Sequence, residues 1–515
     1  MAARRAGGPP ARVAVGPTPT LSHQIRAVPT GFVRGFQRFD HGNAAEILVG
    51  PWVLIVIDLL PTVRNRLRAV AVVRIEHADE DGVTIMPNRR QFLVGAAGLL
   101  AAAALDSGCA RHTAGTPSNP DVPDVAPPSL QPVSQTQLQT AAQADAAFGA
   151  ALYQKLAADN EQFVFSPYSV ATALRMTWVG AKGQTASEMA AILGITVALE
   201  QALAADATLR SQLAKYAAAK GGTELETANV LWPQSGFPLK SDFVGRVEAA
   251  YGAHLKTLDF KGDAERARSV INQAIAQQTN DKIENLLPSG AVTDQTRLVL
   301  TNAVYLNAKW LRPFDPDDTN DGEFTRADGS TVTAPMMSQL EEFGYVDADS
   351  HQGLVMKYLD SDLSMIVLLP KADLAPLEAA VRSTGITPLM TDAQSTRVQV
   401  FLPRWKTSTG ADLVKDLNAM GMREAFGDRA DFSGITDADS LQISGVYHQA
   451  RISVGEKGTE AEAATAVVEK AGAAPGPQGD QPPVFEADRP FLYAIIDGTG
   501  TPLFVGRVTD PSKEQ

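Results

Sequence analysis

Few side chains in this 515-residue chain are of a type and spacing that could do chemistry. A pairing of His448 with Ser166 would suggest nucleophilic catalysis. Ser166, however, precedes Pro167 at the expected start of a helix, where a serine ordinarily caps the first turn. The sequence also lacks the Gly-x-Ser-x-Gly and His-Glu-x-x-His patterns of hydrolases. We therefore expect that the protein is not an enzyme.

The run Gly498-Thr499-Gly500 is the next candidate, as a loop that could hold phosphate. It stands between two strand-like runs and lacks the strand, loop and helix order that phosphate binding needs. The run predicts a hairpin turn instead. We expect no cofactor and no bound metal.

An alternating segment follows a strand-like run and leads into a loop rich in Gly, Pro and Ala. Read with a period of two, its small and mostly apolar face consists of Thr459, Ala461, Ala463, Thr465 and Val467. The opposite face consists of Glu460, Glu462, Ala464 and Ala466. This pattern is typical of a strand that lies on a packed core with its charges outward, yet it stands where a loop is expected. The segment suggests a conformational switch; the alternative is a flexible alanine-rich linker.

The segment Glu456-Lys457-Gly458-Thr459-Glu460-Ala461 resembles the hinge of the reactive-centre loop in serpins, the protease inhibitors that trap their target covalently. The resemblance extends over residues 134–511. Other segments match serpin motifs in the family's order: Phe165-Ser166-Pro167-Tyr168-Ser169, Gly180-Ala181-Lys182-Gly183-Gln184-Thr185, Thr301-Asn302-Ala303-Val304-Tyr305-Leu306-Asn307-Ala308-Lys309-Trp310, Tyr447-His448-Gln449-Ala450 and Asp488-Arg489-Pro490-Phe491-Leu492. Each motif is weak alone, but so many in order make a strong signal.

The resemblance implies the serpin fold. This is an α+β fold with a large mixed central β-sheet, additional sheets, about nine helices and an exposed reactive-centre loop, here at residues 456–487. The order of the expected elements agrees, because helix patterns dominate the first half of the domain and strand patterns the second.

His448 falls on the inward face of an expected strand, and a buried histidine needs hydrogen-bond partners. In serpins the matching histidine bonds to Asn and Ser groups at the centre of the main sheet. By resemblance these are Asn302, Ser166 and Ser169, and the cluster marks where the sheet opens to admit the loop. The resemblance also places Trp310 where the loop enters.

The resemblance further implies a suicide-substrate mechanism. The protease attacks the exposed loop and forms an acyl-enzyme, and the cut loop then inserts as a new central strand and distorts the protease. The hinge residues implied are Glu456, Gly458, Thr459, Glu460, Ala461, Glu462, Ala463, Ala464 and Thr465. Glu462 departs from the family's usual run of Ala, Gly and Ser. Because it lies on the outward face, we expect slower insertion rather than none.

Family spacing counted from Glu456 places the reactive bond between Gly472 and Ala473, which suits an elastase- or subtilisin-like serine protease. A shorter frame places Lys470 and Ala471 there, which suits a trypsin-like protease. A non-inhibitory serpin that acts as a binding module is a further alternative. We expect the partner to be a serine protease held in a covalent acyl adduct, and the inhibitor to be a monomer.

The net charge of −13 argues against nucleic acid as the main partner and against a polyanionic cofactor. Residues 201–220 carry only Arg210, Lys215 and Lys220 as cations, which is not a dense basic patch. A solvated helix face is the expected structure there.

Residues 86–109 predict an export signal. The pair Arg89-Arg90 precedes a short apolar run, which ends at Ser107-Gly108-Cys109 and resembles a bacterial twin-arginine signal with a lipobox. Asp106 stands where a lipobox usually has an aliphatic residue. We expect an exported protein that is extracellular or anchored at the cell surface, outside any membrane except for a lipid on Cys109. As the only cysteine, Cys109 can form no intramolecular disulfide.

An export signal belongs at the start of a chain, and Met86 stands immediately before this one. We therefore hypothesise that residues 1–85 are an overextended start and are not translated, or that they are disordered. A membrane anchor at residues 47–60 is the rival interpretation, although this run is short for a span. Residues 110–133, dense in Thr, Pro, Ser and Asp, predict a disordered linker to a domain at residues 134–512.

Overall fold

The structure is a computed structural model that describes residues 121–217, 222–253, 255–437, 441–459 and 481–513, together with the backbone of three strands nearer the N-terminus. The chain divides into two compact units, residues 1–113 and 114–515, and each is described by itself. Among the described residues, no helix is long and apolar enough to cross a membrane. Within the same residues, no group of three or more His, Cys, Asp and Glu side chains could hold a metal ion.

The first unit contains an antiparallel sheet of strands β1 (Ala44–Val49), β2 (Trp52–Asp58) and β3 (Arg68–Arg74). The strands are rich in Val and Ile, whose branched side chains favour extended backbone. The sequence analysis expects a disordered or untranslated segment here, so these strands are a difference from that expectation. The run proposed as a membrane anchor is divided between β1 and β2. Whether the segment is translated stays a prediction.

The described part of the second unit has eight α-helices, close to the nine that the family resemblance implies. They are α2 (Gln135–Asp159), α3 (Pro167–Trp178), α4 (Gly183–Ile192), α5 (Leu199–Ala217), α6 (Ser241–Tyr251), α7 (Ala264–Gln278), α8 (Leu374–Thr384) and α9 (Val414–Met420). Local sequence fixes their starts. Ser134 and Gln137 form a capping box at α2, and the Ser166 side chain caps α3 with Pro167 as its first residue.

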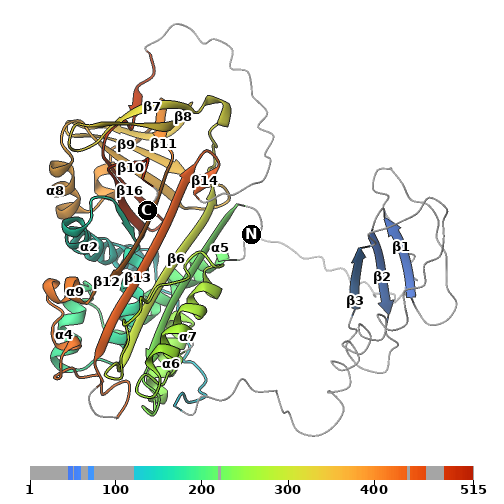
Figure 1. Ribbon diagram of the computed structural model, residues 1–515, viewed down its shortest axis with the longest axis vertical. Coiled ribbons are helices and arrows are strands. Elements are labelled where there is room, and N and C mark those ends of the chain that lie inside the picture. The colour runs from blue at the N-terminus through green and yellow to red at the C-terminus, as the bar shows by residue number, and fades with distance from the viewer. Residues whose placement is uncertain are drawn as a thin grey trace, which may run out of the picture. The chain divides into compact units, whose positions relative to one another are not determined.

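The central sheet has five strands in the order β12-β13-β14-β6-β5 (Figure 1). Its strands are β5 (Thr223–Pro233), β6 (Leu298–Lys309), β12 (Trp405–Asp412), β13 (Ile443–Gly455) and the two-residue β14 (Gly458–Thr459). β13 runs parallel to β6, whereas β14 is antiparallel to both. The sheet is therefore mixed. Buried residues fill nearly every position of β6, as expected of a strand covered on both faces.

A second sheet of nine strands has the order β15-β11-β8-β9-β10-β16-β17-β4, with β7 paired to β8. Its strands are β4 (Phe163–Phe165), β7 (Asn320–Thr325), β8 (Thr331–Asp347), β9 (His351–Lys357), β10 (Ser364–Pro370), β11 (Gln394–Pro403), β15 (Val484–Glu486), β16 (Phe491–Ile496) and β17 (Pro502–Val508). The predicted hairpin turn lies between β16 and β17, which pair antiparallel.

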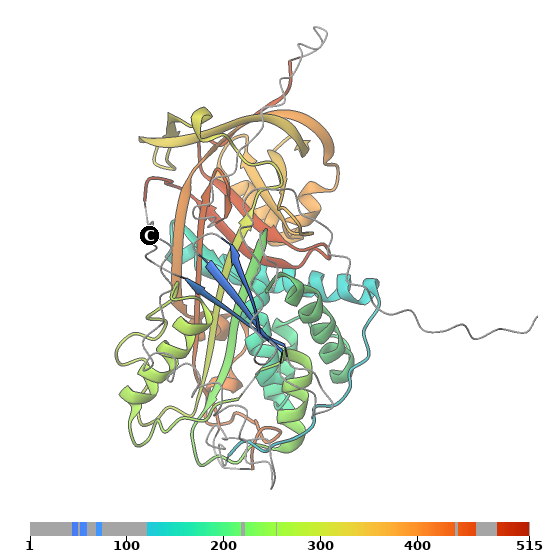
Figure 2. The same cartoon turned by 90° about the vertical axis from the view of Figure 1, so that its right-hand side faces the viewer.

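Helices cover the two faces of the lower half of the central sheet. On one face, Ile271 and Ile275 of α7 pack in a cluster with Trp232 of β5 and Val299 of β6. On the other, residues of α3 pack in a larger cluster that includes Leu300 of β6. Figure 2 shows helical layers on either side of the long strands. The upper half packs on the nine-stranded sheet through a third cluster. One face of the upper half is open, and there β12 and β13 alternate buried residues with exposed or partly exposed ones.

Residues 121–133 lie against the domain, which differs from the disordered linker expected from their composition. Val122, Val125 and Leu130 pack on the large core cluster, and the carbonyl of Asp121 accepts a hydrogen bond from the backbone N–H of Leu239 at 2.8 Å. The prediction weighed the polar residues and prolines and overlooked these spaced aliphatic side chains, which bury apolar surface. Residues 110–120 lie outside the described residues.

Candidate functional site

Strand β14 occupies the space between the upper ends of β13 and β6 (Figure 1). The Cα of Thr459 lies opposite Val454 of β13 and Ala308 of β6, and Gly458 lies opposite Gly455 and Lys309. The first residues of the predicted hinge are therefore already part of the central sheet. The turn between β13 and β14 is held by two further backbone bonds, in which Trp310 N–H donates to Lys457 O and Phe314 N–H donates to Glu456 O, both at 2.9 Å.

Gly458 is required by its position in this narrow site. Its φ is 151°, a conformation that side chains disfavour, and a Cβ atom there would lie 1.9 Å from the carbonyl oxygen of Ala308. No other residue fits without moving β14 away from β6.

Glu456 fastens the turn from the other side. Its carboxylate accepts hydrogen bonds from Arg404 Nε at 2.6 Å and from the Thr319 hydroxyl at 2.7 Å, and it forms an ion pair with Arg404. Burial acts to raise the pKa of Glu456, but the hydrogen bonds from Arg404 and Thr319 outweigh burial and hold that pKa below its usual value. The carboxylate therefore stays ionised and anchors the hinge at neutral pH.

Thr459 points inward, with 1% of its surface exposed. Its hydroxyl shares a hydrogen bond of 2.6 Å with the hydroxyl of Tyr358, and the Tyr358 ring stacks on Trp310 with 4.5 Å between ring centroids. The indole N–H of Trp310 donates to the carbonyl of Gly455 at 2.9 Å. Trp310, which the resemblance places at the entry of the loop, therefore contacts the hinge directly.

The structure brings together the four side chains of the predicted sheet-opening cluster. The Asn302 amide of β6 bonds to the His448 ring of β13 through Oδ1, and its Nδ2 donates to the Ser169 hydroxyl at 2.6 Å. The backbone N–H of Ser166 donates to His448 Nε2 at 3.1 Å. All four residues are buried. The cluster connects β13 and β6 to each other and to the start of α3, which lies behind them. These are the two strands that would have to separate for the loop to enter.

The hydrogen bonds define the state of His448. Since Nε2 accepts from Ser166, Nδ1 carries the proton and donates to Asn302. Burial lowers the pKa of His448 to about 3, so the ring is neutral at physiological pH. The Ser166 hydroxyl accepts from the backbone N–H of Ser169 as a helix cap. The serine–histidine geometry of a hydrolase is not formed by this pair.

The strands part just above this cluster. β13 and β6 pair in parallel up to Ala450 and Val304, and above them β14 pairs with both strands through Gly458 and Thr459. His448 lies opposite Asn302, two residues below the last parallel pair. Any further residue of the loop that enters the sheet must therefore separate the strands toward the His448–Asn302 contact.

Sequence reasoning missed several residues of this site. Asn229 of β5 lies opposite Asn302, and its side chain accepts a hydrogen bond from the Ser169 hydroxyl at 3.0 Å. A polar side chain in a buried strand was the available signal for Asn229. Tyr358, Arg404 and Thr319 contact the hinge from segments far away in sequence, and no local pattern marks them.

Other predicted residues lie outside the described part of the chain. These are the hinge residues Glu460, Ala461, Glu462, Ala463, Ala464 and Thr465, the reactive-bond residues Lys470, Ala471, Gly472 and Ala473, and Cys109. The chain is described again from Gln481, and β15 then joins the edge of the nine-stranded sheet by pairing with β11. The predicted loop therefore spans from the central sheet to that edge.

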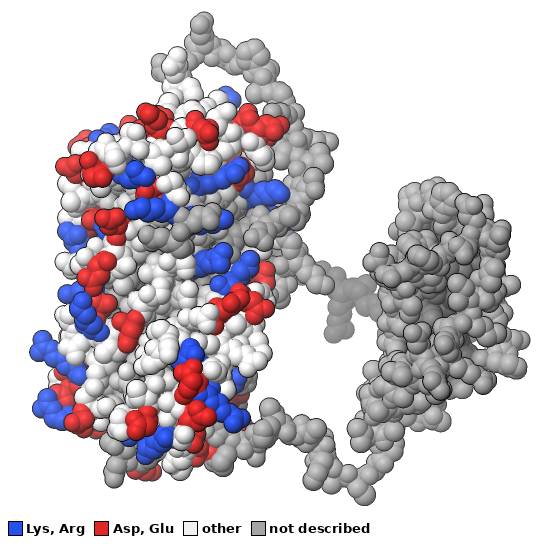
Figure 3. Space-filling model, viewed as in Figure 1, with Lys and Arg blue, Asp and Glu red and all other residues white. Residues whose placement is uncertain are grey.

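On the face drawn in Figure 3, Lys and Arg side chains are interspersed with Asp and Glu side chains. Charged side chains of the domain form ion pairs, such as Arg404 with Glu456 and Lys371 with Asp347. Among the described residues on this face, cations and anions alternate and form no dense basic patch of the kind that binds a polyanion.

Comparison with known proteins places this geometry in a family. A family profile described as serpin (serine protease inhibitor) matches residues 143–511. An uncharacterized serpin-like protein of Thermococcus kodakarensis is 37% identical over 363 residues, which cover 70% of this chain and 83% of that protein. Mouse antithrombin-III is 31% identical over 384 residues, with coverage of 72% and 81%. The solved structure of human thyroxine-binding globulin complexed with thyroxine has a TM-score of 0.65 at 28% identity, with coverage of 73% and 100%.

The chain belongs to the serpin family, whose members are mostly serine protease inhibitors rather than enzymes. The resemblance stated from the sequence motifs is thereby confirmed, and so is the α+β serpin fold with its mixed central sheet.

Proposed function

We propose that this protein inhibits a serine protease by inserting its cleaved loop between β13 and β6. The observation that carries the proposal is β14, since Gly458 and Thr459 already occupy the first two positions of such a strand. Attack of the protease serine on the loop forms the acyl-enzyme and releases the new amino terminus. Residues 460 onward then extend β14 downward and carry the acylated protease with them.

The free energy for insertion comes from backbone pairing and burial. Each added hydrogen bond contributes about 0.5–1.5 kcal/mol net. An inserted strand of some ten residues bonds to two neighbours but replaces the parallel pairing between β13 and β6, so the net gain is on the order of 10 kcal/mol. The inward positions 461, 463 and 465 carry small side chains that suit the space Thr459 occupies above them. Insertion also replaces the His448–Asn302 contact between the strands, which opposes it until the new strand forms.

The register of β14 explains how Glu462 can be accommodated. Continuing the pairing by three residues from Thr459 places position 462 opposite Arg451 of β13 and Tyr305 of β6. Lys282 Nζ already lies 5.8 Å from the centroid of the Tyr305 ring. An inserted Glu462 would thus meet cationic side chains, because residues directly opposite in antiparallel strands are in contact. This supports inhibition despite the departure from the family's usual small residue.

The target that we propose is elastase- or subtilisin-like, with cleavage between Gly472 and Ala473. Small residues at the reactive bond suit proteases with shallow pockets. A trypsin-like target that cuts between Lys470 and Ala471 is the alternative within the same mechanism. The protease would be the sole macromolecular partner, and the inhibitor would act as a monomer.

A non-inhibitory role as a binding module is the second candidate function. The similarity in fold to human thyroxine-binding globulin, a structure complexed with thyroxine, favours it. In that case cleavage of the loop would release the protease without an adduct. We further propose that the protein is exported by the signal at residues 86–109, and that Cys109 is the attachment site of a lipid.

The test is to mix the full chain with an elastase, a subtilisin and a trypsin, followed by denaturing gels and mass spectrometry. We expect an adduct that survives denaturant and a released C-terminal peptide beginning at Ala473. A peptide beginning at Ala471 would indicate cleavage after Lys470 and hence the trypsin-like frame. Complete cleavage without adduct would favour the binding module.

A further inference from the structure

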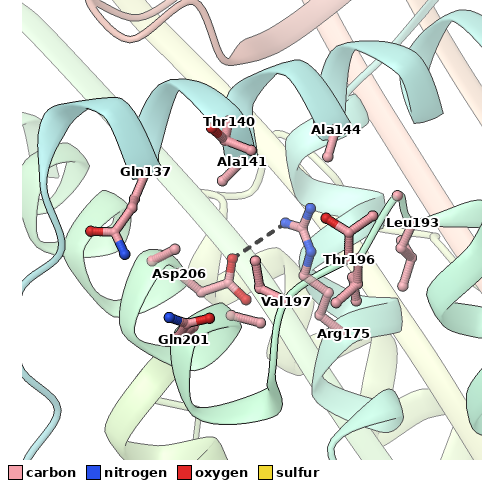
Figure 4. A pocket seen from close by; sticks show the side chains of 14 residues that line it. Gln137, Thr140, Ala141, Ala144, Arg175, Leu193, Thr196, Val197, Gln201 and Asp206 are labelled. Carbon is pink, nitrogen blue, oxygen red and sulfur yellow. Dashed lines mark hydrogen bonds and ion pairs between the residues drawn. The ribbon is translucent and has the colours of Figure 1, made fainter.

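A pocket of about 170 Å³ opens between α2, α5 and the segment that joins α4 to α5, with Arg175 of α3 at its base. None of the residues that line it belongs to the hinge or contacts Gly458 and Thr459 in β14. Figure 4 shows the side chains that converge on it. Its size and lining are those of a binding site for a small molecule.

The walls of the pocket are apolar and come from three elements. Leu193, Ile195 and Val197 line one side, and alanines of α2 and α5 line the other. Val197 is 45% exposed, which makes it one of four large hydrophobic side chains that the described residues expose. An apolar cavity of about 150 Å³ is large enough to bind benzene. The space therefore fits the body of a ligand about the size of one aromatic ring.

The base of the pocket carries charge. Arg175 forms ion pairs with Asp145 and with Asp206, the latter at 3.3 Å between Nη1 and Oδ1. The hydroxyl of Tyr251 donates to Asp206 Oδ2 at 2.7 Å. Asp206 lines the pocket, whereas Asp145 lies beneath it with 1% of its side chain exposed.

Arg175, Asp145 and Asp206 together carry one net negative charge when both carboxylates are ionised. The other polar lining residues, Gln137, Thr140, Thr196 and Gln201, are uncharged. A further cation on α5, Arg210, donates instead to the carbonyl oxygens of Ala249 and Ala250 and does not line the pocket. The pocket thus combines an apolar wall with the Asp206 carboxylate, which lines it beside Arg175, while the second carboxylate, Asp145, lies beneath and balances the Arg175 charge. Attraction to Asp206 in this partly enclosed space is stronger than in water.

We propose that this pocket binds a small organic monocation, a primary ammonium ion on an apolar body of about one aromatic ring. The ammonium group donates to Asp206 and to the neighbouring amide and hydroxyl oxygens of Gln201 and Thr196. The ring lies against Leu193, Ile195 and Val197. Binding at this site is independent of the proposed inhibition of a protease.

Three probes of one shape and different charge test the proposal on the full chain: benzylammonium, benzyl alcohol and benzoate. Titration calorimetry and ligand-observed NMR would measure affinity at neutral pH. We expect benzylammonium to bind at least tenfold more tightly than benzyl alcohol, a difference of about 1.4 kcal/mol, and benzoate to bind more weakly than either. Equal affinities for all three, or no binding of benzylammonium, would overturn the proposal.

Two variants locate the site. Ala202→Phe fills the pocket and should abolish binding, whereas Ala191→Phe, at an exposed residue of α4 that does not line it, should leave binding unchanged. Asp206→Asn should reduce the preference for benzylammonium over benzyl alcohol to less than threefold. If Asp206→Asn fails to fold, the two phenylalanine variants still decide the matter. Undiminished binding of benzylammonium to Ala202→Phe would show that the ligand binds elsewhere.

Discussion

Replacing Thr459 by arginine should convert the protein from an inhibitor into a substrate. The Thr459 side chain is enclosed between β13 and β6, and its hydroxyl bonds to Tyr358. Arginine would place a charge there without a partner, and an uncompensated buried charge costs about 3–5 kcal/mol. The hinge would have to leave the sheet, so that insertion of the cut loop begins from an unfavourable position.

The size of the effect follows from the competition between insertion and hydrolysis of the acyl-enzyme. If about 3 kcal/mol appears in the barrier, insertion slows roughly 100-fold. In most turnovers the acyl-enzyme is then hydrolysed before the loop inserts. The ratio of inhibitor consumed to protease trapped rises at least about tenfold. Denaturing gels with a fixed amount of protease measure this ratio directly, because adduct and cleaved inhibitor separate.

Two control variants separate charge burial from other effects. Glu460→Arg places the same side chain one residue further along, on the face expected to be outward, and should leave adduct formation within about threefold of wild type. Thr459→Ser retains the hydroxyl and should also trap the protease. Unchanged adduct formation by Thr459→Arg would refute the insertion argument. Equal loss in Glu460→Arg would show that charge anywhere in the loop is the cause.

Three further predictions concern stability and insertion. Because burial lowers the pKa of His448 to about 3, the folded protein binds fewer protons than the unfolded chain below pH 6.5. The free energy of unfolding, measured in urea, should therefore fall by about 2 kcal/mol between pH 7 and pH 5. His448→Gln should flatten this pH dependence. An unaltered slope in that variant would show that His448 is not the group responsible. Arg404→Ala should lower the free energy of unfolding by about 1 kcal/mol through loss of its contact with Glu456, and no shift in the urea midpoint would show that the anchor is ineffective. Arg451→Glu should slow adduct formation about two- to fivefold, and a second change, Glu462→Arg, should restore it; absence of rescue would argue against the register.

Most of the fold could be predicted from the sequence, because the family motifs fall on helices and strands that local sequence patterns also predict. Ser166 and Pro167 start a helix by capping chemistry, and β6 is apolar at almost every position because both faces are covered. The segment at residues 121–133 was misjudged, since its spaced aliphatic residues outweigh its polar composition once a surface is available to receive them. Local composition cannot show that surface.

Part of the candidate site could likewise be predicted from the sequence, and part could not. His448 and Asn302 stand in strands with clear alternation, and the family resemblance named them together. Tyr358 and Arg404 contact the hinge across about 101 and 52 residues of sequence. Only the packing of the nine-stranded sheet on the upper half of the central sheet brings them there. The pocket beside Arg175 likewise depends on the approach of α2 and α5, which no sequence motif predicts.

Hydrogen exchange of the loop before and after cleavage tests the central claim most directly. The full chain would be cut between residues 466 and 480 by a protease that is then removed, and exchange of the backbone amides of residues 460–466 would be followed by mass spectrometry. Insertion between β13 and β6 predicts that these amides exchange rapidly in the intact chain and become strongly protected after cleavage, while Thr459→Arg leaves them unprotected. Rapid exchange in the cleaved wild-type chain would contradict the account.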